Sequence, residues 1–296
     1  MLKVLTAFIL AALVTLPSMP LAAGQQSLDT PAIARALGRS GTAMPGGVYR
    51  VSFPRSDLKV SIGGTPVLPG LALGSYAAFK QEPQGALAVG DLVLLEEEIQ
   101  PVMQSLKASG LQVTALHNHL RNEHPHVMYM HFMGTGDAAA IARALHTALA
   151  LSRTPMGAAK PADTATPWFA STIEQTLGRS GKSSNGVLAI SVPRQEDITM
   201  QGMAVPPAMG VATALNFEGV GNTRVATTGD FVLIGSEVGA VQRALVAHSI
   251  EVTALHSHMI GDSPTLYYMH FWAMGAPKDV AAGLKDALSH VAVKAP

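Results

Sequence analysis

Two histidines separated by one residue, His117 and His119, stand in a segment rich in β-branched and apolar residues. If this segment is a β-strand, both side chains leave the same face, with their Cβ atoms roughly 6.5 to 7 Å apart. His131 follows in the next β-rich segment, and a hairpin that places residue 117 opposite residue 131 brings three imidazoles to one point. Three imidazoles with an open fourth position are typical of a Zn²⁺, Cu²⁺, Ni²⁺ or Fe²⁺ centre. The spacing therefore predicts a three-histidine metal site.

The same three histidines recur 139 positions further along the chain, as His256, His258 and His270. Over residues 90–132 and 229–271, 19 of 43 aligned positions are identical, which indicates an internal duplication. We expect a divalent transition metal, Zn or Cu, bound by these histidines. The sequence leaves open whether the two sets form separate sites or one shared site.

Two other interpretations of the histidines remain open. In the first, the protein is a metal-dependent hydrolase in which Glu98 or Glu237, a matched pair, is the general base that activates metal-bound water. The helix dipole also favours an acid in the first turn of a helix, which gives both glutamates a simpler structural role. In the second, the imidazoles satisfy hydrogen bonds in a structural or partner-binding module without metal. Whether the protein is an enzyme is left open.

Other charged residues are matched between the two copies. Asp91 and Asp230 each follow a glycine at the start of a predicted strand, which is more typical of turn chemistry than of catalysis. Arg55 and Arg194 follow the prolines that end another strand. One interpretation is that they bind a carboxylate or phosphate, but we expect them to be solvated charges at the rim of the sheet. None of these four residues is therefore predicted to act at the histidines.

Aromatic and sulfur-containing residues surround the third histidine of each copy. Tyr129 and Tyr268 alternate with it along the strand, so they share its face and either line the site or fill the core. Met128, Met130 and Met133 offer thioethers, which are soft ligands for Cu⁺. Alternating apolar packing explains these methionines more simply, so we expect them to lie in the core.

The elements that must position these side chains follow from hydrophobic periodicity. Each copy reads as α-β-β-β-β-α-β-β-α, in which apolar residues at i, i+3, i+4 and i+7 mark the middle helix. The expected fold class is α+β, with two tandem homologous repeats, each a mostly antiparallel sheet with helices packed on one face. In the first copy the strands are predicted at 48–53, 58–62, 71–79, 87–95, 111–120 and 127–133.

Composition excludes several classes of protein. Of the 296 residues, 48% are hydrophobic and 14% charged, which predicts a folded chain with a sizeable core. The 20 Lys and Arg residues are balanced by 20 Asp and Glu residues, so a nucleic-acid partner is not expected. The absence of cysteine excludes disulfides, thiolate nucleophiles and Cys-based metal sites. The expected partner is the metal ion, and the sequence does not indicate a protein partner.

The N-terminus indicates export. Residues 1–23 begin with a positively charged residue, continue with 13 apolar residues and end with small residues typical of a cleavage site. We therefore predict a signal peptide that is cleaved near Ala23. The apolar run rises only about 20 Å as a helix, which is short of a hydrocarbon core of about 30 Å, and no transmembrane span is expected. The mature protein is predicted to be periplasmic or secreted. Its first repeat covers 24–151, a Pro-rich linker 152–167 and the second repeat 168–296.

Several motifs resemble a known family. The segment from Thr114 to His119, Pro125, the triplet Met130-His131-Phe132 and the segment from Gly90 to Leu94 are similar to the LppY/LpqO family of bacterial exported proteins, here with its domain in tandem. The resemblance implies an exported protein of unassigned biochemical role, often a lipoprotein. This chain departs from that pattern because it has no lipid-accepting cysteine. The family supplies no catalytic residues to transfer.

Overall fold

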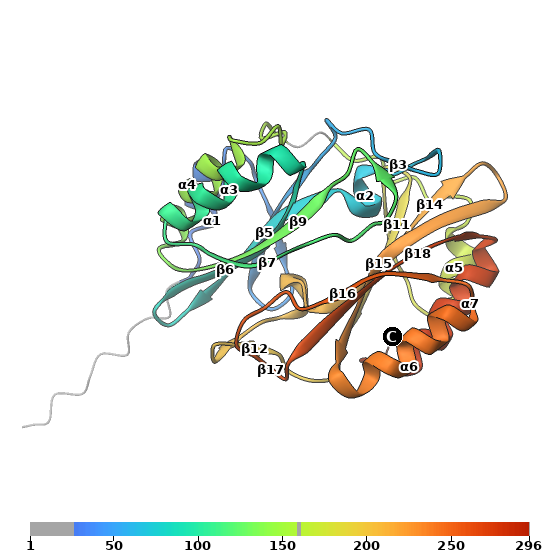
Figure 1. Ribbon diagram of the computed structural model, residues 1–296. Helices are drawn as coiled ribbons and strands as arrows, with labels where there is room; N and C mark the ends of the chain where they lie inside the picture. The colour runs from blue at the N-terminus through green and yellow to red at the C-terminus, as the bar shows by residue number, and fades with distance from the viewer. Residues whose placement is uncertain (1–26, 159–160, 296) are drawn as a thin grey trace, which may run out of the picture.

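The computed structural model describes residues 27–158 and 161–295, and the predicted signal peptide lies outside these residues. Two similar halves follow each other along the chain, the first in blue to green and the second in yellow to red (Figure 1). Each half is a six-stranded sheet with helices, so the expected α+β tandem repeat is confirmed. Within the described residues, no helix is both long and apolar enough to cross a membrane.

The first half contains more short elements than its sequence predicts. Its elements are α1 (Thr30–Leu37), β1 (Thr42–Met44), β2 (Val48–Pro54), β3 (Ser61–Ile62), β4 (Thr65–Pro66), α2 (Pro69–Ala72), β5 (Gly74–Glu82), β6 (Gly85–Leu94), α3 (Glu96–Ala108), β7 (Gln112–His117), β8 (Glu123–His124), β9 (Met128–Gly136) and α4 (Ala138–Leu149). The strand expected over 71–79 begins later, because Pro69 opens the short helix α2 in front of it.

The second half repeats this order, with a 3-10 turn in place of α2. Its elements are α5 (Ala170–Leu177), β10 (Lys182–Ser184), β11 (Val187–Pro193), β12 (Thr199–Met200), β13 (Met203–Ala204), η1 (Pro207–Met209), β14 (Ala212–Val220), β15 (Arg224–Ile234), α6 (Gly235–Ala247), β16 (Glu251–His256), β17 (Asp262–Ser263), β18 (Leu266–Gly275) and α7 (Pro277–Leu288). Among the described residues of the expected linker, 152–167, there is no helix or strand.

The two large sheets have the same antiparallel topology. The strand orders are β1-β2-β5-β6-β9-β7 and β10-β11-β14-β15-β18-β16. In each sheet the strand that carries the third histidine, β9 or β18, lies between its hairpin partner and the long strand β6 or β15. The loop of each hairpin also supplies a short strand, β8 or β17, to a small three-stranded sheet. The hairpin that carries the histidines is thus held from two sides.

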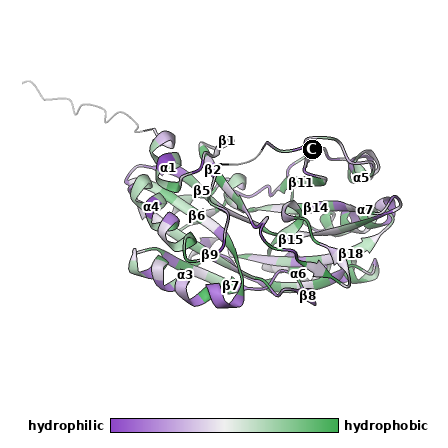
Figure 2. Cartoon of the chain, turned by 90° about the horizontal axis from the view of Figure 1, so that it is seen from above, coloured by the Kyte–Doolittle hydropathy of each residue, from purple (hydrophilic) through white to green (hydrophobic). Residues whose placement is uncertain are grey.

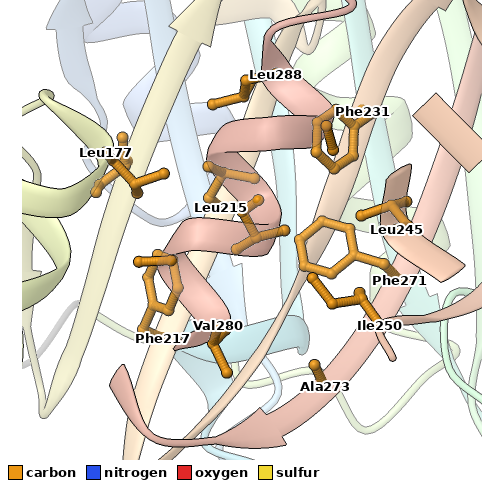
Figure 3. Packing of buried hydrophobic residues seen from close by; sticks show 14 of the residues in the cluster. Leu177, Leu215, Phe217, Phe231, Leu245, Ile250, Phe271, Ala273, Val280 and Leu288 are labelled. Carbon is orange, nitrogen blue, oxygen red and sulfur yellow. The ribbon is translucent and has the colours of Figure 1, made fainter. Parts of the chain in front are cut away.

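Helices cover the outer face of each sheet. In the first half, Met130 and Phe132 of β9 pack with Val102 and Leu106 of the amphipathic helix α3, which alternates between hydrophilic and hydrophobic residues in Figure 2. In the second half, Phe271 is buried among the equivalent side chains beneath α6 and α7 (Figure 3). Because side chains alternate along a strand, the residues between these positions face the opposite side of the sheet.

Those opposite faces pack against each other, so the layers run helices, sheet, sheet, helices (Figure 1). Two buried clusters combine residues of both halves. Met133 lies in one cluster with Val232 and Tyr268, and Tyr129 lies in the other with Ala226. At about 25 cal/mol per Å² of buried apolar area, this interface contributes substantially to stability, and it fixes one half relative to the other. The chain folds as a pseudo-symmetric pair of repeats.

Two glycines at the same position of each repeat allow the central strands to approach closely. A Cβ at Gly229 would lie 1.9 Å from the carbonyl oxygen of Ala214, and a Cβ at Gly90 would lie 2.2 Å from that of Tyr76. The substitutions Gly90→Ala and Gly229→Ala are therefore expected to lower the free energy of unfolding by about 2 to 3 kcal/mol, measured by urea denaturation.

The control for these variants is Gly157→Ala, because a Cβ at residue 157 has no heavy atom within 4 Å. It should change the free energy of unfolding by less than about 0.5 kcal/mol. Equal stability of all three variants would contradict the close strand approach.

Candidate metal centre

A β-bulge in each hairpin directs the histidines toward the interface between the repeats. The pairing of β7 with β9 shifts between Val113 and Ala115, so Val113 packs toward the helices while His117 shares the inner face with Tyr129. A regular strand would place Val113 and His117 on the same face. Bulges commonly redirect a side chain near a functional site, and the equivalent bulge occurs in the second repeat.

The observed register differs from the expected one. Residue 117 was expected opposite residue 131, but His117 lies opposite Tyr129, and Ala115 lies opposite His131. The bulge does not cause this displacement, since the register of Val113 with Phe132 would otherwise continue to place residue 117 opposite residue 128. Because the difference is two positions, His117 and His131 still face the same side. The strand also ends at His117, so His119 lies just beyond it rather than on it.

All six matched histidines meet in one cluster between the two repeats. Each histidine of one repeat stacks on a histidine of the other, with ring centroids 3.5 to 3.7 Å apart. The pairs are His117 with His256, His119 with His270, and His131 with His258. A pseudo-two-fold axis explains this pattern, because a shift of 139 positions exchanges the last two pairs and maps the first onto itself. The structure therefore places the histidines in a single shared site.

Two tyrosines and one threonine contact the second histidine of each repeat, His119 or His258. His119 stacks on Tyr129 with centroids 3.4 Å apart, and His258 stacks on Tyr268 with centroids 3.5 Å apart. The hydroxyl of Thr253, which is the bulge residue of the second repeat, donates to the carbonyl oxygen of His119 at 2.5 Å. A side chain of the second repeat thus holds the backbone that follows the histidine strand of the first.

Several imidazole nitrogens are buried without a hydrogen-bond partner. Among the described residues, these are the Nε2 atoms of His117, His119, His131 and His270. Leaving such an atom unpaired costs about 1 to 3 kcal/mol, so an orphaned buried nitrogen requires an explanation. The Nδ1 atom of His270 lies 3.0 Å from the carbonyl oxygen of Gly229. Since a carbonyl only accepts, Nδ1 carries the proton and Nε2 keeps a lone pair.

Burial keeps the imidazoles neutral. It lowers the pKa of His117 to about 4 and the pKa of His256 to about 3, with nearby histidines adding to the shift of His256. Burial also lowers the pKa of His119, His131, His258 and His270 well below the usual value. Neutral imidazole is the form that binds a metal ion. The cluster is therefore ready for coordination at neutral pH.

The spacing of the nitrogens fits a metal ion. One ligand atom from each of five histidines lies within 4.8 Å of all the others, the set being His117, His119, His256, His258 and His270. The Nε2 atoms of His256 and His258 are 3.0 Å apart. Two nitrogens bound to one ion at about 2.0 to 2.1 Å have a similar separation of roughly 3 Å. The five-histidine group thus has the donors and the spacing for one transition-metal ion.

The sequence did not indicate that Asp91 and Asp230 belong to this region. Asp91 lies opposite His131 in the sheet, and Asp230 lies opposite His270. Burial raises the pKa of Asp230 to about 7, and burial together with the charge of Asp230 raises the pKa of Asp91 well above its usual value. The one sequence signal for a shared role was that the two aspartates occupy equivalent positions in the two repeats. Only the strand pairings of β6 with β9 and of β15 with β18 show that the two aspartates border the histidines.

The structure does not bring Glu98 and Glu237 to the histidines. Glu98 lies in the first turn of α3 on the outer side of the sheet, where its carboxylate accepts hydrogen bonds from Arg55 at 2.7 and 3.1 Å and from the Leu95 and Arg153 amides at 2.9 Å. Within the described chain, neither glutamate belongs to a group that could hold a metal ion. Both serve as structural anchors of a helix terminus.

The second repeat has the same arrangement. Arg194 donates to Glu237 at 2.7 and 3.1 Å, and the Ile234 and Ala292 amides donate to it as well. Burial alone raises the pKa of Glu237, but these four hydrogen bonds bring it below its usual value. The expectation that the matched arginines are solvated is wrong, since Arg55 is 0% and Arg194 2% exposed. The methionine expectation holds for Met130 and Met133, which lie in the buried clusters.

The fold and the site define a pseudo-symmetric tandem-repeat protein with a histidine cluster between its repeats. The chain belongs to the family described as Domain of Unknown Function (DUF1259), whose model matches residues 31–151 and 171–290. The resemblance to the LppY/LpqO family stays a prediction. No curated protein is similar enough in sequence to count as a match.

Two solved structures show a weak likeness to the chain. One is a trimeric bacterial microcompartment shell protein, PduB, with 12% identity, 83% of this chain and 88% of that chain covered, and a TM-score of 0.21. The other is EtuB from Clostridium kluyveri, with 11% identity, 84% and 90% covered, and a TM-score of 0.20. These scores are too low for either structure to inform the fold or the function.

The buried ion pair predicts the effect of removing its carboxylate. Glu98→Ala removes the buried one of the two carboxylates that pair with Arg55 and leaves only the more exposed Asp57 at 2.9 Å, so the free energy of unfolding is expected to fall by about 3 kcal/mol in urea denaturation. The exposed Glu97 of the same helical turn provides the control, and Glu97→Ala should cost less than about 0.5 kcal/mol. A stable Glu98→Ala protein would contradict the anchoring role.

The lowered histidine pKa values predict that acid destabilises the metal-free protein. Below pH 6.5 the histidines of the unfolded chain bind protons, whereas those of the folded chain stay neutral. The free energy of unfolding therefore falls as the pH drops from 6.5 toward 4. For His117 and His256 this amounts to about 1 to 2 kcal/mol each at pH 5. Asp230 and Glu218, whose pKa values burial raises to about 7, and Asp91, whose pKa is raised as well, act in the opposite direction, but the six histidines outnumber these three buried carboxylates.

Thermal unfolding at pH 5 and pH 7.5 checks this expectation. The melting temperature of the metal-free protein should be lower at pH 5, and the difference should shrink in the double variant His117→Gln, His256→Gln. The exposed His290 gives the matched control, His290→Gln. A higher melting temperature at pH 5 than at pH 7.5 would show that the imidazoles are not held neutral.

Proposed function

We propose that this protein binds a divalent transition metal in one centre that both repeats build together. The observation that carries the proposal is the set of buried, unpartnered Nε2 atoms, which come from His117, His119 and His131 of the first repeat and His270 of the second. At least for His270, the hydrogen bond of Nδ1 fixes the tautomer that leaves Nε2 free to coordinate. A metal ion supplies the partner that these nitrogens lack within the protein.

Zn²⁺ and Cu²⁺ suit the five-histidine group best. Neutral imidazole binds both ions well, and the chain offers no thiolate that would favour another ion. His117 and His256 are partly exposed, whereas His258 and His270 are buried. An ion therefore reaches the group from the side of His117 and His256. When bound, it supplies a positive charge and Lewis acidity to an interior of otherwise neutral imidazoles.

The two alternative interpretations receive less support. For a hydrolase, the general base has to lie near the metal, and both Glu98 and Glu237 are bonded to buried arginines at the outer helices. For a structural module without metal, the imidazoles have to satisfy each other, but four Nε2 atoms lack any partner in the described chain. We therefore favour metal binding over both.

The place of action is a second part of the proposal. A periplasmic or secreted protein meets free transition-metal ions outside the cytoplasm, and a histidine-only donor set tolerates an oxidising environment because it contains no thiol. The support for export is the signal-like pattern of residues 1–23 with its exit at Ala23. Fractionation of cells that produce the full chain tests this, since a protein retained in the cytoplasm with residues 1–23 attached would refute it.

Isothermal titration of the untagged protein with Zn²⁺ or Cu²⁺ tests the proposed centre. The change His119→Ala removes a ligand of the five-histidine group. Loss of a residue that only orients a ligand typically lowers metal affinity by about 10- to 100-fold, and His119→Ala should lower it further. The control is His290→Ala, which alters an exposed histidine outside the cluster. Absence of metal binding in the parent protein, or equal affinity of both variants, would refute the proposal.

A further inference from the structure

A second group of metal-ligand atoms lies beside the five-histidine group. One atom each of Asp91, His119 and His131 lies within 4.8 Å of the others. Asp91 and His131 are direct cross-strand neighbours on β6 and β9, while His119 follows β7, so three elements of the first repeat contribute one ligand each. His119 also belongs to the five-histidine group, which places the two groups side by side.

All three side chains carry a buried polar atom without a partner. These atoms are Oδ1 of Asp91 and the Nε2 atoms of His119 and His131. The Nε2 atom of His131 lies 3.7 Å from Oδ1 of Asp91, which is too long for a hydrogen bond. That distance suits two ligands of one shared cation. A buried carboxylate oxygen with no donor is costly, and a bound cation removes that cost.

The second repeat offers a natural comparison. Asp230 occupies the position of Asp91, and the backbone groups of Ala214 and Asp230 itself hydrogen-bond to its carboxylate, whereas only the backbone of Leu92 does so at Asp91. In the described chain, Asp230 has no orphaned oxygen and belongs to no group that could hold a metal ion. The two repeats therefore differ at this position, where only Asp91 keeps an orphaned carboxylate oxygen.

We propose that Asp91, His119 and His131 hold a second metal ion, distinct from the ion of the five-histidine group. The proposal rests on the proposed function, because His119 contributes to both positions. Two imidazoles and one carboxylate form a harder donor set than five imidazoles, and this set is typical of Fe²⁺ sites with open coordination positions. The second position therefore takes a harder divalent ion, Fe²⁺ in preference to Cu²⁺.

A small cavity borders this second position. It has a volume of about 20 Å³ and is lined by His131, Tyr76, Met200, Met209 and other side chains of both repeats. A cavity of about 10 to 15 Å³ is sufficient for one water molecule. The cavity thus provides room for a water-sized molecule beside His131, next to the open positions that three protein ligands leave.

The experiment is a Co²⁺ titration of the metal-free, untagged full chain by isothermal calorimetry, with metal analysis after gel filtration. The parent protein should bind two equivalents of Co²⁺. Asp91→Asn should bind one equivalent, and the matched control Asp230→Asn should bind two. Binding of a single equivalent by the parent, or of two by Asp91→Asn, would overturn the proposal while leaving the first centre intact.

A second pair of variants separates the two positions and guards against misfolding. His131→Ala removes a ligand of the second position that the five-histidine group does not use, so it should also bind one equivalent. His117→Ala should weaken Co²⁺ binding at the five-histidine group and leave Co²⁺ binding at the second position unchanged. If the parent binds no Co²⁺, Zn²⁺ or Cu²⁺ at all, the proposed function fails as well. Retention of two equivalents by His131→Ala would refute the second position even if Asp91→Asn did not fold.

Discussion

The structure depends on burying imidazoles between two apolar sheet faces. Desolvation favours the neutral form of a histidine, and the stacked partner from the other repeat opposes a second positive charge within 4 Å. Apolar packing around Tyr129 and Tyr268 maintains this low-dielectric interior. The same packing buries the Nε2 atoms of His117, His119, His131 and His270 without a partner in the described chain. The buried, neutral state of the cluster is therefore a property of the interface, not of any single strand.

Two small deviations from regular sheet geometry make this interface possible. The bulge after Val113 turns the end of β7, so that a strand which begins by packing against helices ends by facing the other repeat. The glycines before Asp91 and Asp230 let neighbouring backbones approach where a side chain would collide. The ion pairs of Arg55 and Arg194 then fix the start of α3 and α6 on the far side of each sheet.

Much of the fold was predictable because periodicity and repetition are local signals. The period of the middle helix and the hairpin around His131 were expected and are present. The position of Asp91 was not, because a Gly-Asp pair reads locally as a turn and only the strand pairing shows its neighbour. The buried state of Arg55 was missed for the same reason, since its partner Glu98 is 43 residues away. Long-range partners decided both outcomes.

The pseudo-two-fold axis passes between His117 and His256, which stack on each other as equivalent residues. A chain with one repeat that paired with a copy of itself about the same axis would build this cluster from identical halves. In such a homodimer, any change to one carboxylate would be imposed on both. Joining the halves in one polypeptide removes that restriction. The difference between Asp91 and Asp230 shows how two covalently linked repeats can make the two sides of one cluster unlike.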